Sequence, residues 1–525
     1  MSSGARPASP SSAWPRACAT GRSRSGRRPA SGAAGTSLSA RRADGLHLAR
    51  AACGKKGRAG ARRRARRRAA NSQARGQRVS KETVSITFPY AGIGGLEVPA
   101  SRLLGIYDVQ RVGARPSPAS LTEQALRSPI GTQTLGRLAS AGQKVLILCD
   151  DYTRPTPAAE MLPPLLAELR EAGVSPQDVS ILTAQGTHRQ MTRAELARKL
   201  GEEVLRQHPV IQHDWRDEEN LIPLGETSAG LPIIANRHVL QADLLIGLGH
   251  VVPHRITGYS GGAKIVAPGV IGAPRTAAEI HWLGAQVPAR DLLGVIDNPV
   301  RAQVNEMGVR VGLRFVVNAV QDADGRVAAV FAGDPAEAQR QAALASRTIY
   351  SVHLPELADV VVVDSYPADV DFCQAAKAAY AAEVAVRPGG VVILVSLCPE
   401  GVARQHPAVL EYGVRPVEEM RQLVASGEIE DVVAAAILTL TAWVVKERAH
   451  GIMVSPGIAP DDQLRLGFAP ARTPQEALGM ALGIVGRDAR IAVLRHGGEI
   501  APIVEAEAQP EVLGMERLWA GRRGP

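Results

Sequence analysis

The stretch GLGHVVPHRITGYSGGAKIVAPG, residues 247–269, decides how this chain is interpreted. It follows the apolar run Leu244-Leu245-Ile246, which predicts a short buried strand. Loops that leave the carboxyl ends of strands carry the ligand chemistry of many α/β proteins. This loop brings together two histidines, His250 and His254, a glycine-rich turn and Lys264.

The glycine-rich turn, Ser260-Gly261-Gly262, is able to bring several backbone N–H groups close together. Such a nest suits an anion, for example a phosphate group. Lys264 adds either a point charge or a nucleophilic amine beside it. From the spacing alone, a plain glycine turn with two surface histidines is an equally simple interpretation. Other parts of the chain are needed to distinguish this turn from a functional site.

Two other strand ends carry polar clusters. The apolar segment 142–149 runs into Asp150-Asp151-Tyr152-Thr153-Arg154, and the strand 179–184 runs into a loop that holds His188. Helices are expected to follow at 158–172 and 192–200. Alternating strands and helices predict a mainly parallel sheet, and its carboxyl edge is where these clusters would meet. This convergence favours a functional site.

A second α/β unit begins near Tyr350. Strands are expected at 358–364, 390–397, 451–455 and 489–494, and helices at 372–386, 417–426, 429–447 and 474–485. Gln374 and Lys377 share a face of the first of these helices, just after a strand-end loop. Residues 318–350 are expected to form a hinge.

The predicted architecture is therefore two α/β domains with mainly parallel sheets and an active site in the cleft between them. The expected divisions are a disordered basic tail, an N-terminal domain, a C-terminal domain and a short second tail, at 1–80, 81–348, 349–510 and 511–525.

The formal net charge of +10 comes from the first 80 residues. They hold 20 Lys and Arg and one acidic residue, which leaves 41 basic and 50 acidic side chains in the remainder. The tail has almost no apolar periodicity, so we expect it to be disordered and dispensable. Its run of arginines at 62–68 suits electrostatic binding of nucleic acid. A nucleic-acid-binding protein is nevertheless the least favoured of the alternatives.

Composition also indicates the cellular compartment and whether the protein spans a membrane. The five cysteines are scattered without a CxxC pair, which argues against a disulfide framework and for a reducing compartment. No apolar run is long enough to span a bilayer. We therefore expect a soluble cytoplasmic protein with no membrane partner.

The chemical groups point to an enzyme that acts on a small acid with a phosphate-bearing cofactor. Arg154 and Lys377 suit a carboxylate, and two histidines suit proton transfer. A Walker loop and a nucleophile elbow are both missing, and GLGHVV lacks the third glycine of a dinucleotide fingerprint. His281, alone on a predicted helix, is by itself more typical of a packed residue than of a ligand.

Five motifs, taken in order, resemble the nickel-pincer lactate racemase family. They are DDYTRPTP (150–157), AQGTHR (184–189), PHRITGYSGGAKIVAPG (253–269), the segment around His281, and SYPADVDFCQAAK (365–377). The resemblance covers residues 84–505. It implies two α/β domains with the site between them. It also implies a mononucleotide derived from nicotinic acid, in which two sulfur groups and a ring carbon grip one nickel ion.

The resemblance implies a role for each matching residue. His188 and His254 match the catalytic bases, and Lys264 matches the lysine that can tether the cofactor through a thioamide. His281 matches the nickel ligand. Asp151 and Thr153 match contacts to the cofactor, and Arg154, Gln374 and Lys377 match contacts to the substrate. Contacts to the cofactor from Ser260, Gly261 and Gly262 are inferred from the glycine-rich turn.

The implied reaction is racemisation or epimerisation of a 2-hydroxy acid by hydride transfer through a keto acid. The C–H beside a carboxylate is a very poor acid, so hydride transfer avoids a difficult deprotonation. Separate proteins would make the cofactor. An enzyme of the same scaffold with dehydrogenase or lyase chemistry is the second hypothesis.

Two positions depart from the family pattern. Cys373 stands where lactate racemases tend to have tyrosine, and the segment 431–438, DVVAAAIL, lacks the tryptophan and glutamines expected there. Both bear on the substrate pocket, so a 2-hydroxy acid other than lactate, or a sugar acid, is an alternative substrate.

Overall fold

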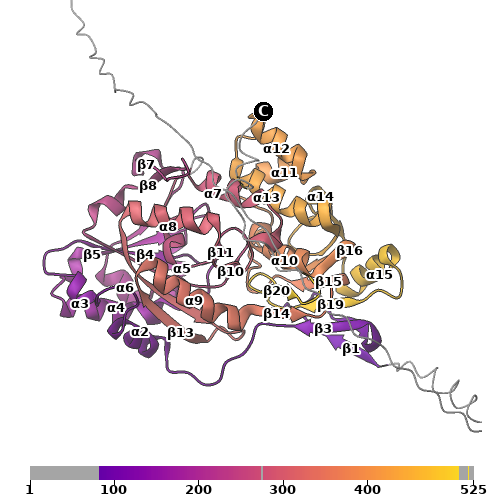
Figure 1. Cartoon of the computed structure of the whole chain (residues 1–525), viewed down its shortest axis with the longest axis horizontal. Helices are drawn as coiled ribbons and strands as arrows, with labels where there is room; N and C mark the ends of the chain where they lie inside the picture. The colour runs from indigo at the N-terminus through magenta and orange to yellow at the C-terminus, as the bar shows by residue number, and fades with distance from the viewer. Residues whose placement is uncertain (1–81, 273–275, 508–517, 519–525) are drawn as a thin grey trace, which may run out of the picture. The chain divides into compact units, whose positions relative to one another are not determined.

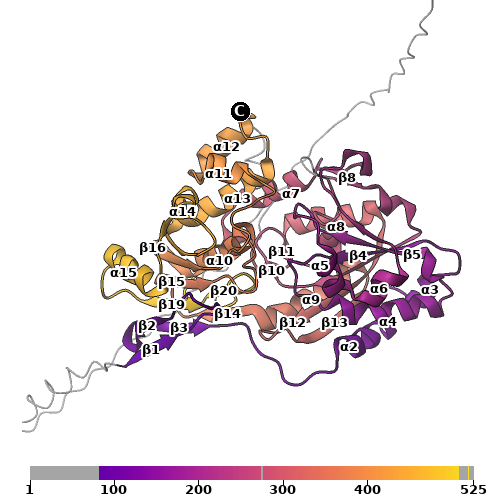
Figure 2. The same ribbon diagram turned by 180° about the vertical axis from the view of Figure 1, so that it is seen from behind.

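The computed structural model describes residues 82–272, 276–507 and 518 (Figures 1 and 2). All of them belong to one unit of the chain. The predicted basic tail and most of the predicted segment 511–525 lie outside the described residues. The predicted start of order near Val84 agrees with the first strand, β1 (Thr83–Ile86).

The first sheet contains the three strand ends singled out in the sequence. Its order is β13-β12-β9-β4-β5-β6, in which only the β12–β13 pair is antiparallel. The strands are β4 (Val145–Asp150), β5 (Val179–Ala184), β6 (Val210–Gln212), β9 (Leu244–His250), β12 (Leu313–Gln321) and β13 (Val327–Gly333). The helices of this half are α2 (Pro118–Arg127), α3 (Leu135–Leu138), α4 (Ala158–Glu171), α5 (Arg193–Leu200), α6 (Glu202–Gln207), α7 (Thr276–Ala285), α8 (Pro299–Val311) and α9 (Pro335–Tyr350).

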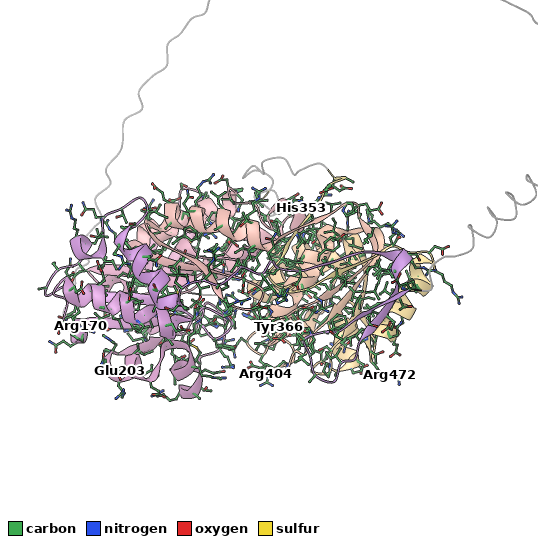
Figure 3. All side chains as sticks on the ribbon, turned by 90° about the horizontal axis from the view of Figure 1, so that it is seen from below. Arg170, Glu203, His353, Tyr366, Arg404 and Arg472 are labelled. Carbon is green, nitrogen blue, oxygen red and sulfur yellow. The ribbon has the colours of Figure 1, made fainter. Side chains whose placement is uncertain are left out.

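The apolar runs of these strands are explained by burial on both faces. In β4, Leu146 and Leu148 belong to one core cluster, while Ile147 and Cys149 belong to another. Side chains alternate across a strand, so a sheet covered on both faces needs apolar residues at every position. Long charged side chains such as Arg170 and Glu203 instead point outward (Figure 3).

The second sheet is parallel throughout, in the order β18-β17-β16-β15-β19-β3. Its strands are β3 (Leu103–Tyr107), β15 (Ala358–Asp364), β16 (Val386–Val395), β17 (Ala449–Val454), β18 (Phe468–Pro470) and β19 (Ile491–Leu494). The helices are α10 (Phe372–Ala385), α11 (Ala408–Tyr412), α12 (Val417–Ala425), α13 (Val432–Ala442), α14 (Pro460–Arg465) and α15 (Pro474–Val485). The predicted α/β class with mainly parallel sheets is confirmed.

The remaining strands of the described chain form two-stranded sheets. They pair β1 with β2 (Leu96–Pro99), β7 (Leu221–Glu226) with β8 (Pro232–Asn236), β10 (Pro253–His254) with β11 (Gly258–Tyr259), and β14 (Ser351–Leu354) with β20 (Ala501–Val504).

Two expectations about chain organisation need correction. The segment 318–350 is not a hinge, because it forms the end of β12, β13 and α9 of the first half. In addition, β3 precedes the first sheet in sequence but pairs with β19, so the second sheet takes a strand from the N-terminal region (Figures 1 and 2). The division at 348/349 otherwise stays a prediction.

Sheet order explains where a ligand would bind. In the first sheet β4 has β5 on one side and β9 on the other, and in the second sheet β15 lies between β16 and β19. Ligands of open α/β sheets bind at such switch points, outside the carboxyl ends of the strands. No helix of the described chain is long and apolar enough to cross a membrane.

Candidate active site

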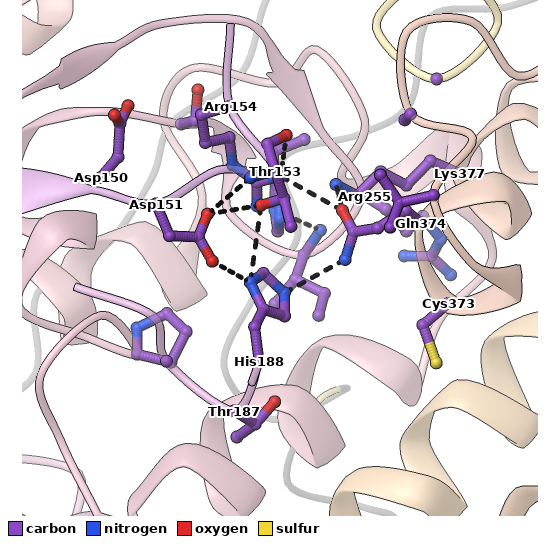
Figure 4. Close-up of a pocket in the computed structure, with 18 of the residues that line it drawn as sticks. Asp150, Asp151, Thr153, Arg154, Thr187, His188, Arg255, Cys373, Gln374 and Lys377 are labelled. Carbon is purple, nitrogen blue, oxygen red and sulfur yellow. Dashed lines mark hydrogen bonds and ion pairs between the residues drawn. The ribbon is translucent and has the colours of Figure 1, made fainter. Parts of the chain in front are cut away.

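A pocket lies at these strand ends and is lined by residues from both halves (Figure 4). It brings together the predicted site residues Asp151, Thr153, Arg154, His188, His254, Ser260, Gly261, Lys264, His281, Gln374 and Lys377. Of the predicted set, Gly262 does not line it. The predicted convergence of three loops is therefore correct, and the loop before α10 completes the pocket.

His188 is held by a carboxylate. Its Nδ1 lies 2.6 Å from Oδ2 of Asp151, whose side chain is 2% exposed. Thr153 Oγ1 donates to the other oxygen of Asp151 at 2.6 Å. Burial alone would raise the pKa of Asp151, but the charge and hydrogen bond of His188 outweigh burial and lower that pKa well below its usual range. This pairing keeps the ring hydrogen on Nδ1 and leaves Nε2 as an acceptor.

Gln374 lies on the opposite side of His188 from Asp151 in Figure 4. Its Oε1 accepts from Arg154 at 3.2 Å and from Lys377 at 2.5 Å, and its Nε2 lies 3.1 Å from His188 Nε2. Asp371 caps α10 by accepting from the backbone N–H of Gln374 at 2.9 Å. Burial and the charge of Arg154 lower the pKa of Lys377 well below its ordinary value. An oxygen that takes hydrogen bonds from both an arginine and a lysine marks the position where a ligand carboxylate would bind, and its charge would favour the protonated lysine.

His254 has different surroundings. Its Nδ1 accepts from the backbone N–H groups of Ile256 and Thr257 at 3.2 and 3.3 Å, so its ring hydrogen lies on Nε2. Burial lowers the pKa of His254 well below its ordinary value, and the nearby charges of Lys264 and Lys377 lower it further. His254 is therefore a neutral imidazole.

Lys264 lies on the short 3₁₀ turn Gly262–Ile265 and faces the pocket. Burial, together with the charges of Arg154 and Arg301, lowers its pKa to about 7. Among the described residues its ammonium group has no hydrogen bond or ion pair. A substantial fraction of Lys264 is thus a free amine near neutral pH, which is the nucleophilic form.

The anion nest predicted at 260–262 is wrong. The N–H of Ser260 already donates to the carbonyl of Val252 at 2.8 Å, and that of Gly262 donates to Asn318 Oδ1 at 2.9 Å. Gly261 has φ +74°, and a Cβ there would lie 2.4 Å from a methyl group of Val251. The glycines therefore serve a tight turn and close packing. A cofactor contact from these three residues stays a prediction.

Arg301, on α8, fixes this turn and was not found from the sequence. It is 4% exposed and donates to the carbonyl oxygens of Thr257, Gly261 and Tyr259. Burial lowers its pKa to about 9. A single arginine within an amphipathic helix is usually a surface residue, so the sequence held no signal for this role.

His281 has the arrangement of a metal-binding histidine. Its Nδ1 lies 2.6 Å from the carbonyl of Ala277, which fixes the hydrogen on Nδ1 and leaves Nε2 free to bind a metal. Burial lowers its pKa to about 4, so the ring stays neutral. The described residues contain no cluster of three or more His, Cys, Asp or Glu able to hold a metal ion. His281 Nε2 is thus available as a single metal ligand.

A second polar network reaches the pocket through Asp150, His250 and Glu499. Thr156 Oγ1 donates to Asp150 at 2.5 Å, Lys199 lies 2.5 Å from the other oxygen of Asp150, and His250 Nδ1 lies 3.1 Å from Thr156 Oγ1. His250 Nε2 points toward Glu499, 4.0 Å away. The glycine pair 497–498 after β19 marks this loop in the sequence.

Comparison with known proteins supplies the family. Residues 92–289 match the lactate racemase N-terminal domain, and residues 355–503 match the lactate racemase C-terminal domain. The chain belongs to the lactate racemase family. That assignment also confirms the expected class of enzyme, an isomerase.

Relatives in this family are distant but cover most of the chain. The lactate racemase of Thermoanaerobacterium thermosaccharolyticum is 28% identical over 76% of this chain and 95% of its own length. The lactate racemase of Lactiplantibacillus plantarum is 27% identical over 73% and 90%.

Solved structures support the same assignment. The T. thermosaccharolyticum lactate racemase apoprotein matches with a TM-score of 0.71 and 27% identity, over 80% of this chain and 100% of that one. A protein from Thermotoga maritima shares the fold, with a TM-score of 0.61 and 20% identity, over 75% and 100%.

Proposed function

We propose that this member of the lactate racemase family interconverts the two configurations at C2 of a 2-hydroxy acid, lactate or a related compound. The observation that carries the proposal is the pairing of His188 and His254 in one pocket with Arg154 and Lys377, whose side-chain nitrogens both donate to a single oxygen. Two proton-transfer groups suit two mirror-image hydroxyls, and the cations suit the carboxylate that both enantiomers share.

The chain's own residues divide the work. The substrate carboxylate replaces Gln374 Oε1 between Arg154 and Lys377, which fixes the acid against the pocket wall. His188 Nε2 then accepts the hydroxyl proton, and Asp151 stabilises the ring while it is cationic. His254 faces the hydroxyl of the other enantiomer.

A nickel-pincer nucleotide is the proposed cofactor, bound by Lys264 and by His281 Nε2. When bound, it supplies the group that takes and returns the hydride of C2. Two observations support this cofactor: the free amine of Lys264 and the single free imidazole nitrogen of His281. The proposed partners are a small 2-hydroxy acid and the separate proteins that make the cofactor. Cytoplasmic location stays a prediction.

The direct test is chiral analysis of product formed by the full chain loaded with cofactor. Each single enantiomer of lactate and of larger 2-hydroxy acids should move toward an equal mixture. His188→Ala and His254→Ala should each lower the rate about 10²–10⁴-fold, the usual contribution of a positioned acid or base.

A keto acid that accumulates without the opposite enantiomer would instead indicate dehydrogenase chemistry. Racemisation that survives in both histidine variants would exclude the proposed mechanism. The intact mass of the protein purified from its own host, compared with Lys264→Ala, tests the cofactor tether independently of turnover.

A further inference from the structure

Beside the carboxylate-binding residues, one wall of the pocket is apolar. It is formed by Val433, Ile437 and Leu440 of α13, which line the pocket and lie at i, i+4 and i+7, hence on one face of the helix. Two helices of the site pack against α13: α7, which carries His281, and α10, which carries Gln374 and Lys377. The wall therefore belongs to the same pocket as the residues that would bind the acid.

The facing stripe on α10 has the same spacing. Cys373, Lys377 and Tyr380 all line the pocket, and they too lie at i, i+4 and i+7. Lys377 would hold the carboxylate, so Cys373 and Tyr380 flank the acid along the helix. In Figure 4 the thiol of Cys373 points away from Gln374 and the hydrogen-bonded cluster. Burial raises the pKa of this thiol well above its usual value, so it is a neutral, weakly polar group.

The α13 wall also lacks hydrogen-bonding groups. The two threonines of this helix donate their hydroxyls to its own backbone, Thr439 to Ala435 at 2.7 Å and Thr441 to Ile437 at 2.9 Å. Val433, Ile437 and Leu440 offer no partner to a hydroxyl or charge on the substrate chain. Two polar groups of the same lining already have partners, since Tyr380 is hydrogen-bonded to Thr441 and His406 Nδ1 lies 2.8 Å from Asp431.

We infer that the α13 wall selects the substituent on C2 and that the enzyme takes 2-hydroxy acids with an apolar side chain larger than methyl, not polyhydroxylated sugar acids or dicarboxylates. The inference rests on the proposed function, since it places the substrate by Lys377. An apolar group of several carbons fills the space beside Cys373 and Ile437, whereas a methyl group leaves it empty.

The test compares kcat/KM of the loaded full chain on five probes: lactate, 2-hydroxybutyrate, 2-hydroxyisocaproate, glycerate and malate. Glycerate and 2-hydroxybutyrate differ only by a hydroxyl in place of a methyl group, so they isolate the polarity of the wall. We expect 2-hydroxybutyrate to exceed glycerate, and 2-hydroxyisocaproate to exceed lactate, each by about 10-fold or more. Equal values within each pair would overturn the inference. A preference for malate would mean that the exposed Arg404 at the pocket, and not the α13 wall, selects the side chain on C2. That result would also overturn the inference.

Matched variants locate the effect. Ile437→Asn should reduce the ratio of 2-hydroxybutyrate to glycerate by about 10-fold, while Val432→Thr, on the same helix but outside the pocket lining, should leave it unchanged. Cys373→Tyr should lower the ratio of 2-hydroxyisocaproate to lactate. An unchanged ratio in folded Ile437→Asn, or an equal change in Val432→Thr, would contradict the assignment.

A binding measurement separates this inference from the proposed function. Tertiary acids that carry a 2-methyl group cannot lose hydride from C2, so their affinity is read by calorimetry without turnover. If no probe is racemised, the proposed function fails. The inference then stands only if 2-hydroxy-2-methylbutyrate binds more tightly than 2-methylglycerate and Ile437→Asn removes the difference.

Discussion

The surroundings of His188 and His254 differ more than their shared task would suggest. His188 donates to a buried carboxylate, Asp151. His254 receives two backbone N–H groups, and the positive charges of Lys264 and Lys377, when these lysines are protonated, oppose a charge on its ring. A carboxylate therefore neighbours His188, whereas burial and positive neighbours lower the pKa of His254 well below its ordinary value. A reaction that is symmetric in its substrates is served by two groups that are electrostatically opposite.

The hydrogen bonds also set the ring nitrogens apart. His188 presents a lone pair at Nε2, and His254 presents a hydrogen there. For His254 to accept a proton at Nε2, its ring hydrogen has to move to Nδ1, at the expense of the two backbone contacts. Thr257 Oγ1 lies 3.2 Å from Nδ1 and gives its own hydrogen to the carbonyl of Tyr259, so it is placed to accept one from the ring.

Thermodynamics determines which kinetic constants can show the difference between His188 and His254. Enantiomers have equal free energy, so kcat/KM has to be equal in the two directions for any variant that racemises a simple 2-hydroxy acid. The difference between the two histidines must then appear in kcat and KM taken separately.

The largest effect on kcat is expected from removing the carboxylate beside His188. Asp151→Asn should lower kcat by about 10²–10⁴-fold, because the amide does not stabilise a cationic ring and allows the other tautomer. Kinetics in both directions, with a thermal unfolding curve to check the fold, would measure it. A loss smaller than threefold would mean that Asp151 does not support proton transfer at His188.

A smaller effect is expected on the other side. Thr257→Val removes the hydroxyl near His254 Nδ1 and should lower kcat about 5-fold, the worth of one hydrogen bond. Thr257→Ser keeps the hydroxyl and is the matched control. If the valine and serine variants behave alike, Thr257 has no part in the tautomer of His254.

The third test titrates the cation beside His254. Because its pKa is lowered to about 7, Lys264 is protonated and unreactive below that pH and becomes a free amine above it. Acetylation of the cofactor-free full chain, followed by peptide mass spectrometry, should show the modification of Lys264 rising with pH through about 7. Arg154→Gln removes one of the charges that lower this pKa, so the midpoint should move upward. A midpoint that stays in place would mean that burial alone sets it.

Much of the fold was predictable because its signals are local. The strand 358–364 and the helix 474–485 have the limits expected from apolar periodicity and from Pro at the helix start. The helix expected at 429–447 instead ends as α13 at Ala442 and continues as a π-helical turn, Trp443–Arg448. Hydropathy does not register a change from 3.6 residues per turn.

The site was predictable to the extent that its residues follow strand ends or family motifs. His188, His254 and Lys264 met both conditions. Arg301 met neither condition, and Glu499 follows β19 but lies in none of the five motifs. The roles of both arise from contacts between segments far apart in sequence. The supposed nest at 260–262 failed for a related reason: local sequence shows that N–H groups can converge, but not that Val252 and Asn318 already accept them.

The pairing of β3 with β19 ties the two ends of the described chain together, Leu103 beside Ile491. Contacts this far apart in sequence have a high loop-closure entropy and form late in folding. During synthesis, β3 emerges early and has to wait, with its edge unpaired, until almost the whole chain has been made. The second sheet is thus complete only once β19 has been made, and a chain cut before β19 would expose two unpaired edges, those of β3 and β15, to aggregation.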